Sequence, residues 1–478
     1  MTRGPDAERS PMFFQHVYDP DLAQGGFVIG CQQNGHAVVV DPRRDVDTYL
    51  RIAEANGLTI VGVTETHIHA DYLSGTRELA ARTGARVWLS DMGDADWKYA
   101  FEGSPLRDGS EIAVGNVVLR AVHTPGHTPE HLSFLVIDGA TSDEPMMILT
   151  GDFVFVGDVG RPDLLDEAAG GVDTRYQGAK DLFASLRDRF LALPDHVQVW
   201  PGHGAGSACG KSLGAVPGTT VGYERRTAWW ADFLAADDAA GFTGALLEGQ
   251  PDAPSYFGRM KRWNKQGPAV LGHRDAPREL DAADVAERLA RNEILFLDTR
   301  TMAQWHQDAV NNALFLPFGS NFATYASYAI DPERDEQEIV VLAADASQAD
   351  VMRDKLSWTG IDRFAGYVTT LAPFPRAEIP LMPPAEVERR DDVRVLDVRT
   401  ASEHAADHID GATQLHAGRV RWHLDELPRD GTLMAHCQGG GRSAVIASLL
   451  RRQGRSDATE LQGGFDAWLA HRSASTPA

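Results

Sequence analysis

The side chains best suited to chemistry begin with residues 66–72, which read Thr-His-Ile-His-Ala-Asp-Tyr. An apolar run at residues 58–63 precedes them and predicts a buried strand. Two imidazoles and a carboxylate therefore stand where a strand ends and a loop begins. Because imidazole nitrogen and carboxylate oxygen are donors that zinc and iron accept in proteins, the segment predicts a metal site.

Three later segments repeat this chemistry. Each places histidine or aspartate at the end of an apolar run or on a turn of proline and glycine, so that loops from different strands can converge on one ion. A single His-x-His pair is weak support for a metal. Four such loops are a strong signal, because a purely structural explanation must account for all of them at once. The three segments are His123-Thr-Pro-Gly-His127-Thr-Pro-Glu-His131, Leu149-Thr-Gly-Asp152 and Trp200-Pro-Gly-His203.

The elements that must position these loops follow an α/β pattern. From about residue 13 to residue 263, short apolar runs alternate with helical stretches. Polar, turn-rich segments at 264–278 and 377–384 predict linkers. The chain is therefore expected to form three domains, at residues 13–263, 279–376 and 384–472.

A cysteine and an arginine bracket a glycine-rich turn near the C-terminus. Residues 437–442 read Cys-Gln-Gly-Gly-Gly-Arg, between an apolar strand and an apolar helix. Successive glycine N–H groups with a helix N-terminus behind them form an anion nest, which lowers the pKa of a thiol and stabilises a thiolate or a persulfide. Cys437 is the predicted nucleophile, Arg442 closes the loop, and the loop between them consists of Gln438, Gly439, Gly440 and Gly441.

The second and third segments look like an internal repeat. Leu297-Asp-Thr-Arg300 corresponds to Leu396-Asp-Val-Arg399, 99 residues later. Where the later copy enters the Cys437 loop, the earlier copy reads Ala-Asp-Ala-Ser at residues 344–347. Only the later copy has a nucleophile.

Composition limits the partners. The 478 residues carry 45 Lys+Arg and 68 Asp+Glu, so the net charge is 45 − 68 = −23, with no basic stripe. This balance argues against nucleic acid and anionic membranes and favours small-molecule substrates. The three cysteines are too few for a disulfide framework. Neither residues 1–11 nor any window of about 18 residues is apolar enough for a signal peptide or a membrane span, so we expect a cytoplasmic protein. The sequence leaves open whether the protein forms a homo-oligomer.

The order of the four metal loops resembles the metallo-β-lactamase superfamily over about residues 13–263. The loop at residues 437–442 is similar to the rhodanese active-site loop, and its six residues match the length seen in sulfurtransferases. The related phosphatases use a loop one residue longer. These resemblances imply an α/β fold, an αββα sandwich followed by two rhodanese-like α/β domains of which the first is inactive.

Residue 72 separates two kinds of enzyme within that superfamily. Enzymes of the glyoxalase II type carry a histidine there and bind two metals, whereas this chain has Tyr72. A phenol must lose a proton, with a pKa of about 10, before it binds a metal well. The pattern looks instead like the persulfide dioxygenases, which hold one iron. This resemblance implies one Fe(II) per metallo-β-lactamase domain, held by His67, His127 and Asp152 as a facial triad.

The same resemblance assigns supporting roles to His69, Asp71 and His203, which would orient the ligands or water. Arg161 lies nine residues after Asp152 and could hold a substrate carboxylate in a two-pronged contact. A structural ion pair of Arg161 with Asp158 or Asp163 is an equal alternative. Cys209 could face the iron pocket and receive or relay a persulfide, or it could be a bystander thiol.

The whole chain resembles the fusions of a persulfide dioxygenase with rhodanese domains that serve bacterial sulfide detoxification. The resemblance implies that a low-molecular-weight thiol persulfide is oxidised with O₂ to sulfite, and that Cys437 passes sulfane sulfur to sulfite to give thiosulfate. Two rival interpretations stay open. One is a glyoxalase II-like metal-dependent thioester hydrolase fused to a sulfurtransferase, and the other is a sulfur-carrier or persulfide-sensing module with a vestigial metal domain.

Overall fold

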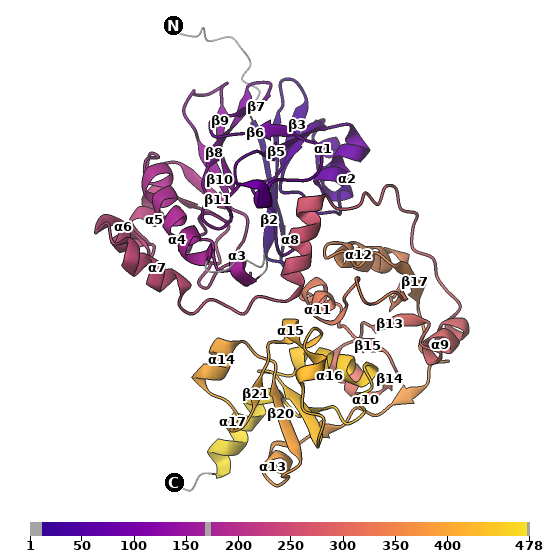
Figure 1. Ribbon diagram of the computed structural model, residues 1–478. Helices are drawn as coiled ribbons and strands as arrows, with labels where there is room; N and C mark the ends of the chain where they lie inside the picture. The colour runs from indigo at the N-terminus through magenta and orange to yellow at the C-terminus, as the bar shows by residue number, and fades with distance from the viewer. Residues whose placement is uncertain (1–11, 168–173, 476–478) are drawn as a thin grey trace. The chain divides into compact units, whose positions relative to one another are not determined.

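The computed structural model describes residues 12–167 and 174–475, and Figure 1 labels its helices and strands. The predicted lack of a signal peptide concerns residues 1–11, which lie outside the described residues. The chain divides into two compact units. The first ends at Gln250 and resumes over Phe257–His273, and the second consists of Pro251–Tyr256 and Arg274–Ala478.

The first unit is built on two six-stranded sheets. The order in the first sheet follows the chain, antiparallel from β1 to β3 and parallel from β3 to β6. Its strands are β1 (Met12–Asp19), β2 (Gln24–Cys31), β3 (His36–Val40), β4 (Thr59–Thr64), β5 (Arg86–Ser90) and β6 (Ser104–Leu106).

The second sheet has the order β12-β11-β10-β9-β8-β7 and is antiparallel except between β10 and β11. Its strands are β7 (Glu111–Val114), β8 (Val117–His123), β9 (Leu132–Asp138), β10 (Met147–Gly151), β11 (Gln198–Pro201) and β12 (Thr219–Thr220).

Apolar side chains fill the space between the two sheets and also line their outer faces. Strand β2 is buried along its whole length, because its alternate side chains face the other sheet and the helices outside. Phe27 packs with Phe134 of the second sheet, whereas its neighbour Val28 packs with Tyr49 of α1.

Helices cover both outer faces, so the predicted αββα sandwich is confirmed (Figure 1). α1 and α2 lie on the first sheet, and α4 to α7 lie on the second. The helices of this unit are α1 (Asp47–Ala55), α2 (Thr76–Thr83), α3 (Leu164–Glu167), α4 (Thr174–Ser185), α5 (Val221–Thr227), α6 (Ala231–Ala235), α7 (Ala239–Leu247) and α8 (Tyr256–Gln266).

The loops that carry the predicted metal ligands leave β4, β8, β10 and β11, and backbone hydrogen bonds join them. The Leu132 N–H donates to the Thr66 carbonyl oxygen at 2.8 Å, across the two sheets. The Gly202 N–H donates to the Gly151 carbonyl oxygen at 2.9 Å, beside the parallel pair β10 and β11. The sandwich therefore brings side chains far apart in the sequence to one edge.

The second unit contains two parallel sheets with the same strand order. The earlier copy runs β15-β13-β16-β17 and the later copy β21-β20-β22-β23, with β19 added beside β23. The strands are β13 (Ile294–Asp298), β15 (Leu314–Phe315), β16 (Glu338–Leu342), β17 (Phe364–Val368), β19 (Leu381–Met382), β20 (Val393–Asp397), β21 (Thr413–Gln414), β22 (Thr432–His436) and β23 (Thr459–Leu461).

Local detail repeats between the copies. Asp298 pairs with Arg300 at 2.7 Å, and Asp397 pairs with Arg399 at 2.7 Å. A capping box begins the next helix in each copy. These shared contacts support the internal repeat. The helices are α9 (Ala282–Ala290), α10 (Met302–Gln307), α11 (Phe322–Ala329), α12 (Ala346–Ser357), α13 (Pro384–Val387), α14 (Ala401–Ala406), α15 (Ala417–Val420), α16 (Gly441–Arg452) and α17 (Gly464–Ser475).

The two copies share one apolar core, which joins Phe315 and Phe322 of the earlier copy to Val445 and Leu449 of α16. Together they therefore form one compact unit, although separate domains were predicted. The predicted linker at 377–384 is also structured. Strand β18 (Arg376–Ala377) pairs with β14 (Ala309–Val310) of the earlier copy, and β19 pairs with β23 of the later copy. The segment is ordered because its backbone N–H and C=O groups find hydrogen-bond partners in both copies.

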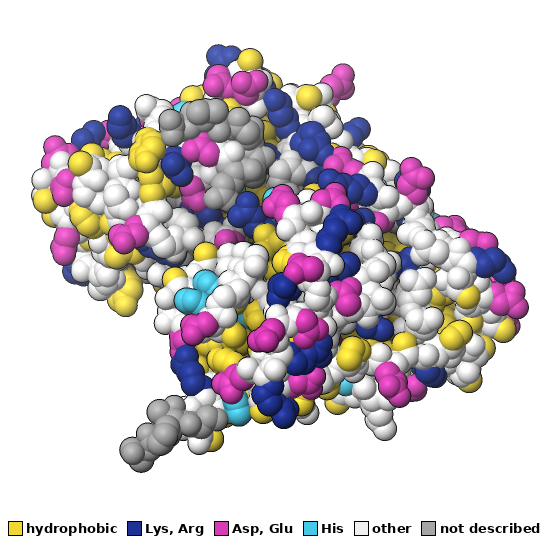
Figure 2. Space-filling model, turned by 60° about the horizontal axis from the view of Figure 1, so that its bottom comes forward, with side chains coloured by type: hydrophobic (Ala, Val, Ile, Leu, Met, Phe, Trp, Pro, Cys, Tyr) yellow, Lys and Arg dark blue, Asp and Glu magenta, His cyan; other side chains and the backbone are white. Residues whose placement is uncertain are grey.

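Charged groups of both signs cover the face of the molecule drawn in Figure 2. Lysine and arginine side chains are interspersed with aspartate and glutamate, and neither sign gathers into a stripe on this face. Within residues 12–167 and 174–475, every helix is too short or too polar to cross a membrane.

Candidate functional site

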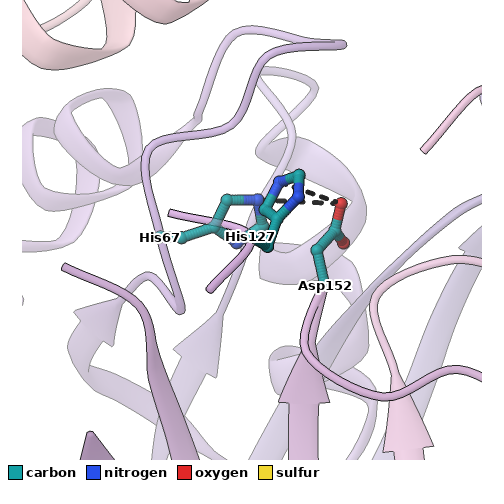
Figure 3. Close-up of side chains that lie close together, drawn as sticks. All are labelled: His67, His127 and Asp152. Carbon is teal, nitrogen blue, oxygen red and sulfur yellow. Dashed lines mark ion pairs between the residues drawn. The ribbon is translucent and has the colours of Figure 1, made fainter. Parts of the chain in front are cut away.

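Three of the predicted ligands meet in the first unit, where Figure 3 shows both imidazole rings turned toward one carboxylate. Nε2 of His67 lies 3.8 Å from Oδ2 of Asp152, and Nε2 of His127 lies 3.6 Å from the same oxygen. All three residues are buried. These separations exceed a good hydrogen bond, as expected of donors arranged around an ion rather than bonded to one another. The group can therefore hold a metal ion.

The other ring nitrogens are already engaged, which fixes the orientation of both rings. Nδ1 of His67 lies 2.9 Å from the Thr66 hydroxyl group, and Nδ1 of His127 lies 3.0 Å from the Arg161 carbonyl oxygen. In each ring this leaves Nε2 for a metal. Such outer contacts are what hold histidine ligands in place in metal sites.

Burial sets the protonation states of this group. It lowers the pKa of His67 well below 6.5 and that of His127 to about 3, so both rings are neutral and offer a lone pair. Burial also raises the pKa of Asp152 to about 6, against the opposing effect of His203. A cation between the three groups would favour the ionised carboxylate. Two neutral imidazoles and one carboxylate fit a ferrous ion.

A second group lies on the other side of Asp152. Atoms of Asp71, His203 and Cys209 lie within 4.8 Å of one another, and all three residues are buried. Nε2 of His203 is 3.5 Å from Oδ2 of Asp71 and 3.5 Å from Oδ1 of Asp152. Among the described residues, Oδ2 of Asp71 is buried without a hydrogen-bond partner. Asp152 therefore lies between the two clusters, and Cys209 belongs to the cluster beside the predicted iron ligands.

Tyr72 is turned away from both clusters. Its hydroxyl group donates to the Asp41 carbonyl oxygen at 3.3 Å and accepts from Nε2 of Gln24 at 3.2 Å. Burial, followed by the charges of Asp41 and Asp71, raises the pKa of Tyr72 well above 10, so the phenol is neutral. Tyr72 therefore offers no ligand to a second metal.

His69 lies beside the centre and bonds to an aspartate that the sequence analysis missed. Oδ1 of Asp41 is 3.1 Å from Nε2 of His69 and accepts from the Thr66 N–H at 2.7 Å. Burial alone would lower the pKa of His69, but Asp41 outweighs it and raises this pKa to about 9. Asp41 also has a φ of 52°, a conformation unusual for a residue other than glycine. An aspartate directly after the apolar run at 37–40 was the signal that could have identified it.

Helix α8 supplies a second missed residue, Asn264, at the start of a predicted linker. Its amide Nδ2 donates to the carbonyl oxygens of His69 at 2.9 Å and Tyr72 at 2.7 Å. Its Oδ1 accepts from the Ser74 N–H at 2.9 Å. Asn264 therefore clamps the loop that carries His67 and Asp71, which corrects the linker prediction at this residue.

Arg161 forms the structural ion pair that was the alternative to substrate binding. Its side chain is 1% exposed and pairs with Asp163, and its Nη1 donates to the Ala208 carbonyl oxygen at 3.0 Å. Its own carbonyl oxygen holds His127. A guanidinium group that is buried and paired in this way joins the loops of His127 and Cys209, and this placement argues against contact with a substrate carboxylate.

In the second unit, the residues predicted around Cys437 lie in the loop between β22 and α16 and in the first turn of α16. The sulfur atom of Cys437 accepts from the Gly440 N–H at 3.2 Å and from the Ser443 hydroxyl group at 3.6 Å. Gly440 has a φ of 101°, which favours glycine, and this turn aims its N–H at the sulfur. At the turn where a nest was predicted, two donors therefore face the sulfur, and Gly439 and Gly441 flank Gly440.

Two loop side chains are held from outside. Both terminal nitrogens of Arg442 donate to Glu403 of α14, at 2.8 and 2.7 Å. Burial opposes this charge, but the Arg442 contact lowers the pKa of Glu403 to about 2, so the pair is ionised at neutral pH. The Gln438 amide bonds to Asp466 and Arg399. Arg442 is thus oriented, and Gln438 is committed to structure.

Comparisons with known proteins agree with this architecture. The Metallo-beta-lactamase superfamily matches residues 26–203, and the Rhodanese-like domain family matches residues 385–471. A crystal structure of a metallo-beta-lactamase from Staphylococcus aureus subsp. aureus COL is 36% identical, with a TM-score of 0.64, and covers 74% of this chain and 98% of its own.

Two curated relatives differ in their chemistry. The mitochondrial persulfide dioxygenase ETHE1 of Bos taurus is 25% identical over 203 residues, which are 41% of this chain and 69% of the relative. A hydroxyacylglutathione hydrolase of Rhodospirillum rubrum is 28% identical over 177 residues, which are 37% of this chain and 60% of the relative. By its fold, its metal loops and the likeness to the Staphylococcus aureus structure, this chain belongs to the metallo-beta-lactamase superfamily, and it carries a rhodanese-like domain after that fold.

Proposed function

We propose that this protein is a non-haem Fe(II) persulfide dioxygenase joined to a sulfurtransferase. It would oxidise a low-molecular-weight thiol persulfide with O₂ to sulfite, and Cys437 would pass sulfane sulfur to sulfite to give thiosulfate, as part of sulfide detoxification. The observation that carries the proposal is the convergence of His67, His127 and Asp152 while Tyr72 is turned away. The similarity to a persulfide dioxygenase supports it.

The chain's own residues prepare the oxidation site. When bound, one ferrous ion would supply adjacent coordination positions for the persulfide and for O₂. Thr66 and the Arg161 carbonyl oxygen hold the two rings so that Nε2 faces the centre. His203 has a raised pKa, because Asp152 and Asp71 outweigh the effect of burial, and it can hold a proton at Nε2 between these carboxylates.

The loop of the second unit prepares the sulfur transfer. The Gly440 N–H and the Ser443 hydroxyl group point at the Cys437 sulfur and stabilise a thiolate there. The thiolate attacks the sulfane sulfur of a persulfide and keeps that sulfur as a cysteine persulfide, while the carrier thiolate leaves. The earlier copy cannot do this, because Asp345 caps α12 where the later copy has its loop.

Metal analysis combined with an oxygen electrode tests the proposal. We expect one iron per chain and O₂ uptake that depends on an added thiol persulfide, with sulfite as the product when Cys437 is replaced. A panel of persulfides of glutathione, coenzyme A and cysteine would identify the carrier thiol. Iron-loaded protein that consumes no O₂ with any of them would refute the dioxygenase.

One observation favours a second candidate, a metal-dependent thioester hydrolase. Asp71, His203 and Cys209 could hold a second cation beside the first, with Asp152 between the two. The similarity to a hydroxyacylglutathione hydrolase points the same way. Two zinc ions per chain and cleavage of a glutathione thioester would support this function instead.

The proposed partners are a thiol persulfide, O₂, sulfite and thiosulfate, rather than nucleic acid or a membrane. Their small size agrees with a surface of net charge −23, which attracts neither nucleic acid nor anionic lipid. A cytoplasmic location and a homo-oligomer belong to the same proposal. Gel filtration with light scattering would test the oligomer.

A further inference from the structure

The earlier rhodanese-like copy lacks a nucleophile but lies against the active loop of the later copy. Its helix α11 packs against α15 and α16 of the later copy. A Cβ atom built on Gly441 would lie 3.6 Å from the hydroxyl oxygen of Tyr325, and one built on Gly440 would lie 3.3 Å from the sulfur of Met302. Two side chains of the earlier copy, Tyr325 and Met302, therefore lie against the glycine turn around Cys437.

The hydroxyl group of Tyr325 is available for a hydrogen bond. Among the described residues, its hydroxyl group has no hydrogen-bond partner. Its ring is half-buried, and the pKa of Tyr325 is raised, first by burial and then by the nearby Cys437, against the effect of Arg442. The phenol is therefore protonated at neutral pH and can donate a hydrogen bond toward the loop.

Three donor groups of the active loop are already engaged. The Gly440 N–H and the Ser443 hydroxyl group already face the sulfur, and both terminal nitrogens of Arg442 face Glu403. An acceptor anion that approaches the persulfide of Cys437 can gain a further hydrogen bond on its own oxygen atoms from a donor beside the loop. Tyr325 is next to the loop and uncommitted.

We propose that the Tyr325 hydroxyl group binds an oxygen atom of the sulfite that takes sulfur from Cys437, so that the inactive copy completes the active site of the other. This role rests on the proposed sulfurtransferase function. The lone pair of the sulfite sulfur forms a bond to the terminal sulfur of the Cys437 persulfide. The bond from that sulfur to Sγ breaks, and its electron pair remains on Sγ as the thiolate. Sulfite becomes thiosulfate, and no external oxidant or reductant is required.

Tyr325→Phe tests this role, because it removes only the hydroxyl group. With glutathione persulfide as sulfur donor, we expect the KM for sulfite to rise about tenfold, the effect of losing a hydrogen bond to a charged group. With cyanide, an acceptor that has no oxygen atoms, we expect unchanged kcat and KM. The loading of Cys437 with sulfur, followed by mass spectrometry, should also be unchanged.

Tyr328→Phe is the matched control, one turn further along α11. Tyr328 packs its ring against His416, 5.5 Å between centroids, so the loss of its hydroxyl group should leave the KM for sulfite unchanged. Equal kinetics of Tyr325→Phe and wild type with sulfite would overturn the proposal, as would an equal loss with sulfite and with cyanide. Wild-type protein that transfers sulfur to neither acceptor would instead refute the sulfurtransferase function itself.

Discussion

The hydroxyl group of Tyr72 donates a hydrogen bond to the backbone carbonyl oxygen of Asp41, 3.3 Å away, instead of facing the metal loops. The carboxylate group of Asp41 in turn accepts a hydrogen bond from the N–H of Thr66, the residue directly before His67. Tyr72 therefore helps to fix the strand end from which His67, a candidate metal ligand, projects.

Tyr72→His should restore a second metal site. The phenol is protonated and bonded to Asp41, whereas an imidazole at this position would be a neutral ligand that can turn toward Asp71 and His203. We expect the metal content, measured by mass spectrometry after loading with zinc, to rise from one to two ions per chain. Tyr72→Phe is the control and should stay at one. A content of one ion in Tyr72→His would show that the tyrosine is not what excludes the second metal.

His127→Ala and Cys437→Ser should separate the two proposed activities. His127→Ala removes one of the three proposed metal ligands, so persulfide-dependent O₂ uptake should be lost while sulfur transfer by Cys437 remains. Cys437→Ser should keep O₂ uptake and accumulate sulfite, because only the transfer step is removed. If Cys437→Ser abolished all activity and His127→Ala changed little, the protein would be a sulfur carrier with a vestigial metal domain.

Asn264→Ala should loosen the metal loop from a distance. The substitution removes three hydrogen bonds, to the backbone of His69, Tyr72 and Ser74, and leaves buried groups unsatisfied. We expect iron affinity to fall about 10- to 100-fold, as for other outer contacts of metal ligands. Equilibrium binding with a competing chelator would measure it. Lys265→Ala, on the same helix, is the control and should bind iron as the wild type does.

Acid should destabilise the second unit through His436. Both ring nitrogens of His436 are buried without a hydrogen-bond partner among the described residues, and burial lowers the pKa of His436 from 6.5 to about 4. As the pH falls, His436 therefore takes up a proton near pH 6.5 in the unfolded chain but only near pH 4 in the folded chain. Stability from this residue is complete above pH 6.5 and falls as the pH falls toward 4.

Urea unfolding of wild type and His436→Leu at pH 7 and pH 5 would measure this effect. The wild type should lose about 2 kcal/mol more than the variant between the two values. An equal loss in both proteins would contradict the burial of an uncharged His436.

Much of the site could be predicted because the signals are local. The donor types and the order of the loops around His67, His127 and Asp152 are written in short segments. The alternation of apolar runs with helices predicted an α/β fold, and the resemblance of the loop order to the metallo-β-lactamase superfamily implied its αββα layers. The loop from Cys437 to Arg442 is a contiguous motif, so its nest geometry depends on neighbouring residues alone. For the same reason, the loss of the nucleophile in the earlier copy is visible at residues 344–347.

Side-chain direction and contacts over long sequence distances needed the tertiary structure. Spacing could not tell whether Arg161 faced a substrate or Asp163, and it gave no sign that Asn264, 195 residues after His69, clamps the metal loop. The same holds for Tyr325, which belongs to one copy and roofs the loop of the other. The sequence by itself determined which donors are present and in what order. Packing decided which of them face one another, because two groups meet only where the folded backbone aims both at one point.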